Sequence, residues 1–242
     1  MTPVSRDRSG EFDLRSEPPF RVDYAATDQV VKPIYLFADS QPLFWQEEKG
    51  PFLRSIAARI AKRNPSAAYV GASNGDDPEF YALFEAALDG AGIGDRRMIP
   101  SQLSADDLDH LDRADIVLLA GGDVERGWRT FESNGLKQIL VRRYYEGALL
   151  IGVSAGAIQL GLAGWGSEPG REPRLVDTFR ILPHLVGAHE EDRDWQPLKE
   201  AVRTMGEHAR GYGVPFGGGF IYPPHHSIEP LRKPLVEIRT VH

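Results

Sequence analysis

The chain has 242 residues, of which 41% are hydrophobic and 26% are charged, and its formal net charge is −7. This length and composition suit one α/β domain with a sizeable core. The negative charge, with no stripe of Lys and Arg, argues against a nucleic-acid partner. The sequence contains no cysteine, which excludes disulfides, thiolate metal ligands and a thiol nucleophile.

The apolar residues are too dispersed to suggest a membrane protein. No run of eighteen apolar residues occurs, so we expect no membrane span. The first residues are charged and lack the apolar segment of a secretory signal, so a cytoplasmic location is expected. Residues 1–30 have no sustained periodicity, and we interpret them as a loosely ordered arm before a single domain at 31–242.

Strands and helices alternate in the first two thirds of the chain. Apolar runs predict strands at 31–39, 67–73, 96–100, 114–123 and 148–153. Apolar residues at helical spacing predict helices at 50–63, 77–90 and 104–114, and residues 126–146 contain two helical pieces separated by Ser-Asn-Gly at 133–135. This alternation is typical of a doubly wound, mostly parallel sheet with helices on both faces. The loops that follow its strands meet at one edge, where ligands bind in such folds.

The pattern changes after residue 163. Gly, Pro and charged residues predict a loop at 164–178. An apolar run follows at 179–187, then a helix at 195–208, Gly-punctuated strands at 211–226 and a closing strand at 235–241. No internal repeat or low-complexity linker suggests a second domain.

A G-x-S-x-G pattern occupies residues 152–156, directly after the apolar run that predicts the fifth strand. Small residues around Ser154 are what a sharp strand-to-helix turn requires, because bulky side chains would clash where the chain reverses. In a nucleophile elbow, such a turn presents the serine hydroxyl at the carboxyl edge of the sheet. A plain packing turn lined by small residues is the alternative.

An elbow serine needs a neighbouring base and a third group that orients this base. Among the seven histidines, His184 lies in an apolar run, whereas His189 lies in the polar segment AHEEDRDW; both stay open as the base. Three acidic residues between the serine and these histidines could supply the orienting group: Glu168, Glu172 and Asp177.

Two glycine-rich turns could supply backbone N–H groups for an oxyanion. The first turn supplies the N–H of Ala155, directly after the serine, and the second supplies an N–H at residues 121–122. The adjacent pair at 225–226 provides two histidines without a partner ligand at helical or turn spacing. We therefore expect neither a metal nor another cofactor.

The segments LLAGGD (118–123) and GVSAGA (152–157) together resemble the aspartyl dipeptidase (peptidase E) and cyanophycinase group of serine peptidases. The resemblance covers roughly residues 33–222. It implies the class I glutamine-amidotransferase-like fold, a flavodoxin-like sandwich. Glutamine amidotransferases carry cysteine at the elbow, which this chain lacks.

The resemblance also implies roles for individual residues. Ser154 corresponds to the nucleophile, and Gly122 and Ala155 to the oxyanion donors. The segment Leu-Pro-His-Leu at 182–185 is similar to the one that carries the family's base, which favours His184 over His189. Glu168 resembles the acid, with Glu172 as the alternative.

A second loop resembles the one that holds the substrate's acidic side chain in dipeptidase E. It spans residues 189–193, so His189 and Arg193 become candidate substrate-binding residues. Asp123 joins them, although the dipeptidase has Asn there. The carboxylates at 190–192 would repel an acidic substrate side chain unless they bind its free ammonium group.

The sequence therefore predicts a serine peptidase that acts on short or unusual peptides through an acyl-enzyme. Candidate substrates are Asp-X dipeptides, β-Asp-Arg units of a cyanophycin-like polymer, and a modified peptide. The alternatives are a catalytically silent protein that binds a small molecule or partner on the same fold, and an α/β-hydrolase esterase. The expected partner is a small peptide; a homodimer is allowed for, and neither nucleic acid nor membrane is expected.

Overall fold

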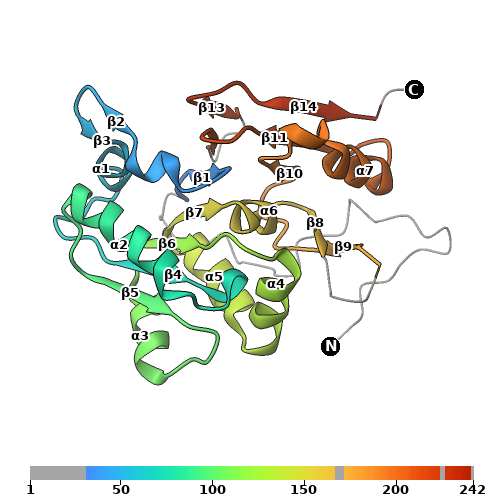
Figure 1. The fold of residues 1–242 in the computed structure, drawn as a ribbon. Helices are drawn as coiled ribbons and strands as arrows, with labels where there is room; N and C mark the ends of the chain where they lie inside the picture. The colour runs from blue at the N-terminus through green and yellow to red at the C-terminus, as the bar shows by residue number, and fades with distance from the viewer. Residues whose placement is uncertain (1–30, 167–171, 224–226, 241–242) are drawn as a thin grey trace.

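A mixed sheet forms the centre of the fold (Figure 1). The computed structural model describes residues 31–166, 172–223 and 227–240. Within these ranges, the strand order of the main sheet is β13-β12-β1-β7-β6-β4-β5. Its strands are β1 (Ile34–Phe37), β4 (Ala67–Val70), β5 (Arg96–Ile99), β6 (Ile116–Leu119), β7 (Leu149–Val153), β12 (Gly219–Tyr222) and β13 (Glu229–Leu231).

The neighbouring strands β1, β7, β6, β4 and β5 of the sheet are parallel, whereas β12 and β13 add antiparallel pairs at one side. Every residue of β1, β4, β6 and β7 is buried. A parallel strand covered on both faces needs such an unbroken apolar run, which is why its sequence does not alternate. The predicted doubly wound α/β fold is thus confirmed.

Helices cover both faces of the main sheet. One face packs against α1 (Phe52–Ala57) and α2 (Pro78–Ala91), in a core that includes Phe37 and Phe84. The other face packs against helices on the opposite side, in a core that includes Leu36 and Phe131. These helices are α3 (Ala105–Arg113), α4 (Val124–Ser133), α5 (Leu136–Tyr145) and α6 (Ala155–Leu160).

A second, smaller sheet lies beside the main one, in the order β10-β11-β14 (Figure 1). It comprises β10 (Leu185–Ala188), β11 (Arg210–Val214) and β14 (Val236–Arg239), and α7 (Gln196–Met205) packs on it. A third apolar cluster, which includes Leu185, Leu198 and Val202, holds this unit together. β10 and β11 are parallel, and β14 pairs antiparallel with β11.

Two short hairpins, β2–β3 (Gln46–Glu47 and Gly50–Pro51) and β8–β9 (Ala163–Gly166 and Arg174–Asp177), complete the strands. The prediction of a loop at 164–178 was wrong for the residues of β8 and β9, which pair as antiparallel strands. The pairing places Gly166 against the buried Glu125 carboxylate, a long-range contact that no local pattern contains. The N-terminal arm predicted at residues 1–30 lies outside the described residues.

Local signals explain where several helices begin and end. The side chain of Asp77 accepts a hydrogen bond from the N–H of Glu79, and Ser104 forms a capping box with Asp107. α1 is shorter than the helix predicted at 50–63. Beyond Ala57 the chain continues in turns with i→i−3 hydrogen bonds, as from Ile60 to Ala57, and no longer as an α-helix.

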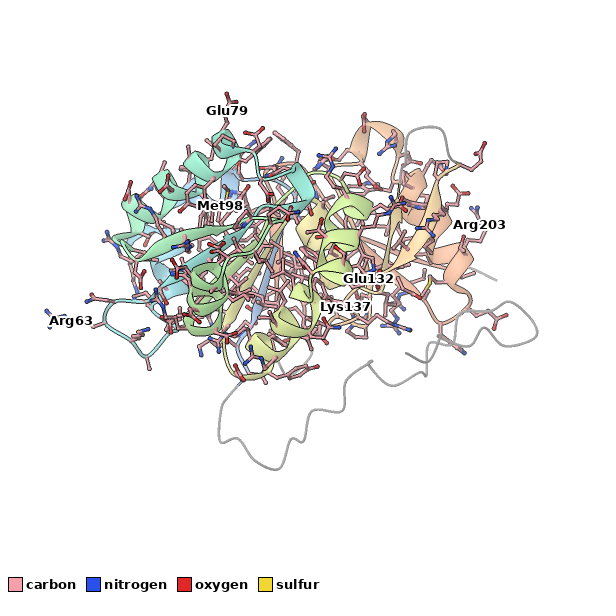
Figure 2. The ribbon with its side chains drawn as sticks, turned by 90° about the horizontal axis from the view of Figure 1, so that it is seen from below. Arg63, Glu79, Met98, Glu132, Lys137 and Arg203 are labelled. Atoms are coloured by element: carbon pink, nitrogen blue, oxygen red, sulfur yellow. The ribbon has the colours of Figure 1, made fainter. Side chains whose placement is uncertain are left out.

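Many charged side chains lie on the outside of these layers, although a few, such as Glu125, are buried. Arg63, Glu79 and Arg203 project from the body of the molecule (Figure 2). Glu132 and Lys137 form an ion pair of 3.4 Å, and Lys137 Nζ also lies 4.6 Å from the centre of a Trp128 ring. In the ranges that the structure describes, no helix has the length and apolarity needed to cross a bilayer.

The close packing of α6 on β6 predicts a large effect at Gly156. A Cβ atom there would lie 2.2 Å from the backbone oxygen of Leu119, so Gly156→Ala should lower the free energy of unfolding by about 1–3 kcal/mol. Gly90→Ala is the control, since nothing lies within 4 Å of its Cβ position in α2; it should stabilise by about 0.5–1 kcal/mol. Urea unfolding measures both, and equal effects would contradict the packing argument.

Candidate active site

Ser154 lies in the turn between β7 and α6, where its backbone has φ 49° and ψ −110°. This conformation is rare for a residue with a side chain and costs about 1–3 kcal/mol. The turn is tight on both sides: a Cβ atom on Gly152 would lie 2.7 Å from the Cα of Ala157. The glycines of the motif therefore allow the chain to reverse immediately before and after the serine.

The neighbouring strands bring further backbone to this point. β7 lies between β1 and β6, so their carboxyl ends meet beside Ser154. The Cβ position of Gly121 lies 3.3 Å from the Cβ of Ser154. Gly122 has φ 134°, and a Cβ atom there would lie 2.2 Å from the backbone oxygen of Ser73. Only glycine fits at residue 122, and the turn it permits lies next to the serine.

His189 is the histidine that contacts Ser154. The Oγ atom of Ser154 and the Nε2 atom of His189 are 2.8 Å apart, which is hydrogen-bond distance. His189 follows β10 directly, and its backbone N–H donates to the oxygen of Val214. Its φ of 45° turns the chain out of the small sheet at the edge where the serine lies.

His184, which the sequence favoured as the base, lies elsewhere. It precedes β10, whereas His189 follows the strand, and five residues of extended chain span about 16 Å. The His184 ring packs against two tyrosines, with its centroid 5.1 Å from that of Tyr212 and 6.4 Å from that of Tyr222. The structure thus brings together Ser154 and His189, not Ser154 and His184.

One sequence signal pointed toward His189. In α/β folds, ligand-binding residues follow the strands, at their carboxyl ends. The apolar run at 179–187 ends before His189, so His189 is in such a position and His184 is not.

The structure describes only part of the segment that carries the predicted acids. Glu168 lies outside the described residues. Glu172 is exposed at the start of the segment that leads into β9. Within the described ranges, the hydrogen bond recorded for the His189 ring is the one to Ser154, and no carboxylate partner is found. Glu190, the next residue along the chain, is buried.

Burial raises the pKa of Glu190, while the nearby Arg193, the N–H of Leu198 and His189 act in the opposite direction. Its Oε2 atom is buried and has no hydrogen-bond partner in the described structure. The carboxyl group therefore favours its neutral form more than an exposed glutamate does.

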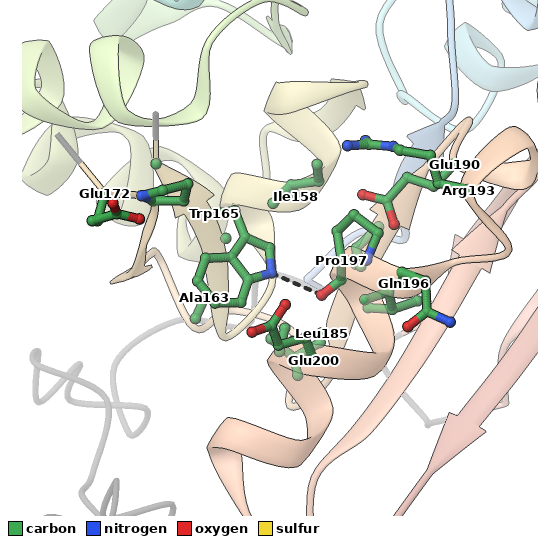
Figure 3. Close-up of a pocket in the computed structure, with 16 residues that line it drawn as sticks. Ile158, Ala163, Trp165, Glu172, Leu185, Glu190, Arg193, Gln196, Pro197 and Glu200 are labelled. Atoms are coloured by element: carbon green, nitrogen blue, oxygen red, sulfur yellow. Dashed lines mark hydrogen bonds between the residues drawn. The ribbon is translucent and has the colours of Figure 1, made fainter. Parts of the chain in front are cut away.

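Two cavities flank the site. The catalytic cavity, of about 220 Å³, reaches Ser154 and His189 and is lined mainly by apolar residues of the segment after β1 and of α2, β6 and β7. The side cavity, of about 730 Å³, lies between α6, hairpin β8–β9, β10 and α7. Figure 3 shows Glu172 across the side cavity from Glu190 and Arg193, and Trp165 Nε1 donating to the oxygen of Pro197 at 2.7 Å.

The predicted substrate-binding residues are separated by this arrangement. Arg193 is exposed and lines the side cavity, so it does not share the catalytic cavity with Ser154. The side chain of Asp123 accepts a hydrogen bond of 2.7 Å from the N–H of Arg126 and caps α4. Of this group, His189 is the residue that reaches the serine.

No metal-binding cluster is found in the described part of the chain, where no group of three or more His, Asp or Glu side chains has the required arrangement. The histidines at 225–226, which were weighed above as metal ligands, lie outside the described residues.

The strained backbone at Ser154 predicts that two substitutions removing its hydroxyl will differ in stability. Ser154→Gly should be more stable than Ser154→Ala by about 1–2 kcal/mol, because glycine adopts a positive φ without steric cost. Thermal unfolding of both variants beside the wild type measures the difference. If alanine were equally stable, the conformation at residue 154 would carry no strain.

The buried carboxyl of Glu190 predicts a dependence of stability on pH. A carboxyl whose pKa is raised on folding binds its proton more tightly in the folded state, so its contribution falls as pH rises through its unfolded and then its folded pKa. Glu190→Gln should therefore raise the melting temperature relative to wild type at pH 8 more than at pH 4. Glu200→Gln, at an exposed position, controls for the lost charge; a pH-independent effect of Glu190→Gln would contradict the assignment.

Comparison with known proteins is consistent with this geometry. The chain resembles the crystal structures of a peptidase from an acI-B1 Actinobacterium (TM-score 0.60, 15% identity, 88% of this chain and 96% of that one) and of a putative peptidase E protein from Listeria monocytogenes EGD-e (TM-score 0.58, 13% identity, 87% and 99%). No curated protein matches the sequence significantly. The family model "Peptidase family S51" matches residues 45–217. The chain therefore belongs to peptidase family S51, a family of serine peptidases.

Proposed function

We propose that Ser154 is the nucleophile and His189 the general base of a peptidase that hydrolyses short or unusual peptides. The observation that carries this proposal is the 2.8 Å contact between Ser154 Oγ and His189 Nε2 at the carboxyl edge of the main sheet. A serine hydroxyl is a weak nucleophile until a base at this distance accepts its proton. Family membership supplies the reaction class.

In the proposed reaction, Ser154 Oγ attacks the carbonyl carbon of the scissile peptide bond while His189 Nε2 accepts the hydroxyl proton. The protonated imidazole then gives this proton to the leaving amine, and an acyl-enzyme ester remains on Ser154. A water molecule, deprotonated by the same nitrogen, attacks the ester and releases the acid.

The developing oxyanion would be stabilised by the N–H groups of Gly122 and Ala155. Gly122 belongs to the turn that touches Ser154, and Ala155 is the first residue of α6, where N–H groups have no acceptor within the helix. Each such donor is worth about 3–4 kcal/mol where it has been measured. The turn at 121–122 would then serve both packing and catalysis.

His189 needs a proton on Nδ1 if Nε2 is to accept one, so an acceptor near Nδ1 would complete the site. We retain Glu168 as the proposed acid and Glu172 as its alternative. Glu190 becomes a third candidate, because it is buried next to His189 and interacts with it electrostatically.

The proposed catalytic pair can be tested with a panel of Asp-X dipeptides, β-Asp-Arg and neutral dipeptides. Ser154→Ala should abolish turnover, and His189→Gln should lower kcat by about 10²–10⁴ through loss of proton transfer. His184→Gln is the matched control and should leave kcat within a few-fold of wild type, since its ring packs on tyrosines away from the serine. A collapse of kcat in His184→Gln but not in His189→Gln would reverse the assignment.

The same panel separates the candidate acids and the silent alternative. Among Glu168→Gln, Glu172→Gln and Glu190→Gln, the variant with the largest loss of kcat identifies the residue that orients His189. A wild type that neither cleaves any peptide nor reacts with a fluorophosphonate at Ser154 would instead indicate a binding protein on a peptidase fold.

A further inference from the structure

The walls of the catalytic cavity, which reaches Ser154, are mainly apolar. Its walls include six aliphatic and aromatic side chains, from the segment after β1, from α2, and from β6 and β7: Leu43, Phe80, Leu83, Phe84, Leu118 and Val153. Its volume, about 220 Å³, is below the usual range for a drug-sized ligand. The space therefore suits one side chain of a substrate whose remainder lies outside.

Two polar side chains in this lining, those of Asp39 and Tyr69, already have partners within the protein. The Oδ1 atom of Asp39 accepts from the N–H of Gln41 at 2.8 Å, and its Oδ2 atom accepts from the N–H of Gly217. The hydroxyl of Tyr69 accepts from Asn74 Nδ2 at 2.7 Å. Burial raises the pKa of Tyr69 to about 12, so this phenol stays neutral at physiological pH.

The charge of the lining disfavours an acidic substrate side chain. Among the residues that the structure describes, those lining the cavity include no Lys or Arg, and Asp39 is their one carboxylate. Arg193, the cation expected to hold an acidic side chain, lines the side cavity instead. An aspartate side chain in the catalytic cavity would lose its hydration and face Asp39 without a cation to compensate.

The rim of the cavity is apolar as well. Phe80 and Leu83 lie on the first turns of α2, and their exposed fractions are 53% and 45%. Covering large exposed apolar side chains beside a cavity with a bound apolar group is favourable, because it removes apolar surface from water. The rim thus extends the apolar surface that a substrate side chain would meet.

We propose that the catalytic cavity binds an apolar side chain, such as that of Leu or Phe, on the residue whose carbonyl Ser154 attacks. The enzyme would then prefer peptides with Leu or Phe at this position over Asp-X or β-Asp-Arg substrates. This substrate class rests on the proposed function of Ser154 and His189. Hydrophobic pockets of this kind discriminate by roughly 10- to 200-fold in kcat/KM.

The test compares X-Ala dipeptides and their N-acetyl forms with X = Leu, Phe or Asp. With wild type, kcat/KM for Leu and Phe should exceed that for Asp by at least about tenfold. Leu83→Arg places a cation at the rim and should lower this ratio at least about tenfold. Ala82→Arg is the matched control, because Ala82 is exposed on the same helix and does not line the cavity; it should leave the ratio unchanged.

Calorimetric binding of the same peptides to Ser154→Ala distinguishes the two proposals. Tighter binding of Leu and Phe peptides than of Asp peptides supports the apolar site even if the wild type hydrolyses none of them. Ser154-dependent hydrolysis with equal or greater preference for Asp overturns the substrate class and leaves the peptidase assignment intact. Peptides that are neither bound nor cleaved overturn the apolar site.

Discussion

The close approach of the β7–α6 turn to the backbone of β6 is the constraint on which the rest of the site depends. Gly156 lies where any Cβ would meet the oxygen of Leu119, and Ser154 is held at a positive φ. Neither feature is favourable locally. Both persist because β7 and its neighbours are buried on both faces, and the free energy of that burial exceeds the local strain.

Two of the acidic residues after β10 interact with the protein itself, which the sequence did not predict. The carboxylates at 190–192 were expected either to repel an acidic substrate or to bind its ammonium group. Glu190 is instead buried, and the Oε1 atom of Glu191 accepts from the N–H of Phe216 at 2.5 Å. Two of the three carboxylates therefore have structural surroundings of their own, and none of the three lines the cavity beside Ser154.

The sequence predicts features that depend on local patterns and misses those that depend on pairing. Apolar runs located the five parallel strands of the main sheet, and the helix starts predicted at 77 and 104 coincide with the N-caps Asp77 and Ser104. Burial on both faces and N-caps leave signatures in a few adjacent residues. The resemblance of the segment at 182–185 favoured His184, whereas the structure places His189 at hydrogen-bond distance from Ser154. The place of β10 in the small sheet depends on its parallel pairing with β11, and neither strand records this pairing alone.

Ser154 and His189 stand on different sheets, which share one apolar core through Val186 of β10 and Val214 of β11. The loop from β11 to β12 connects these sheets, and two carboxylates grip it: Asp39 binds the N–H of Gly217, and Glu191 binds that of Phe216. The 2.8 Å contact therefore reports how the two sheets are docked as well as how the serine is oriented. Because Val186 and Val214 pack in the core of the main sheet, the distance between Ser154 and His189 is fixed by buried packing as well as by this loop.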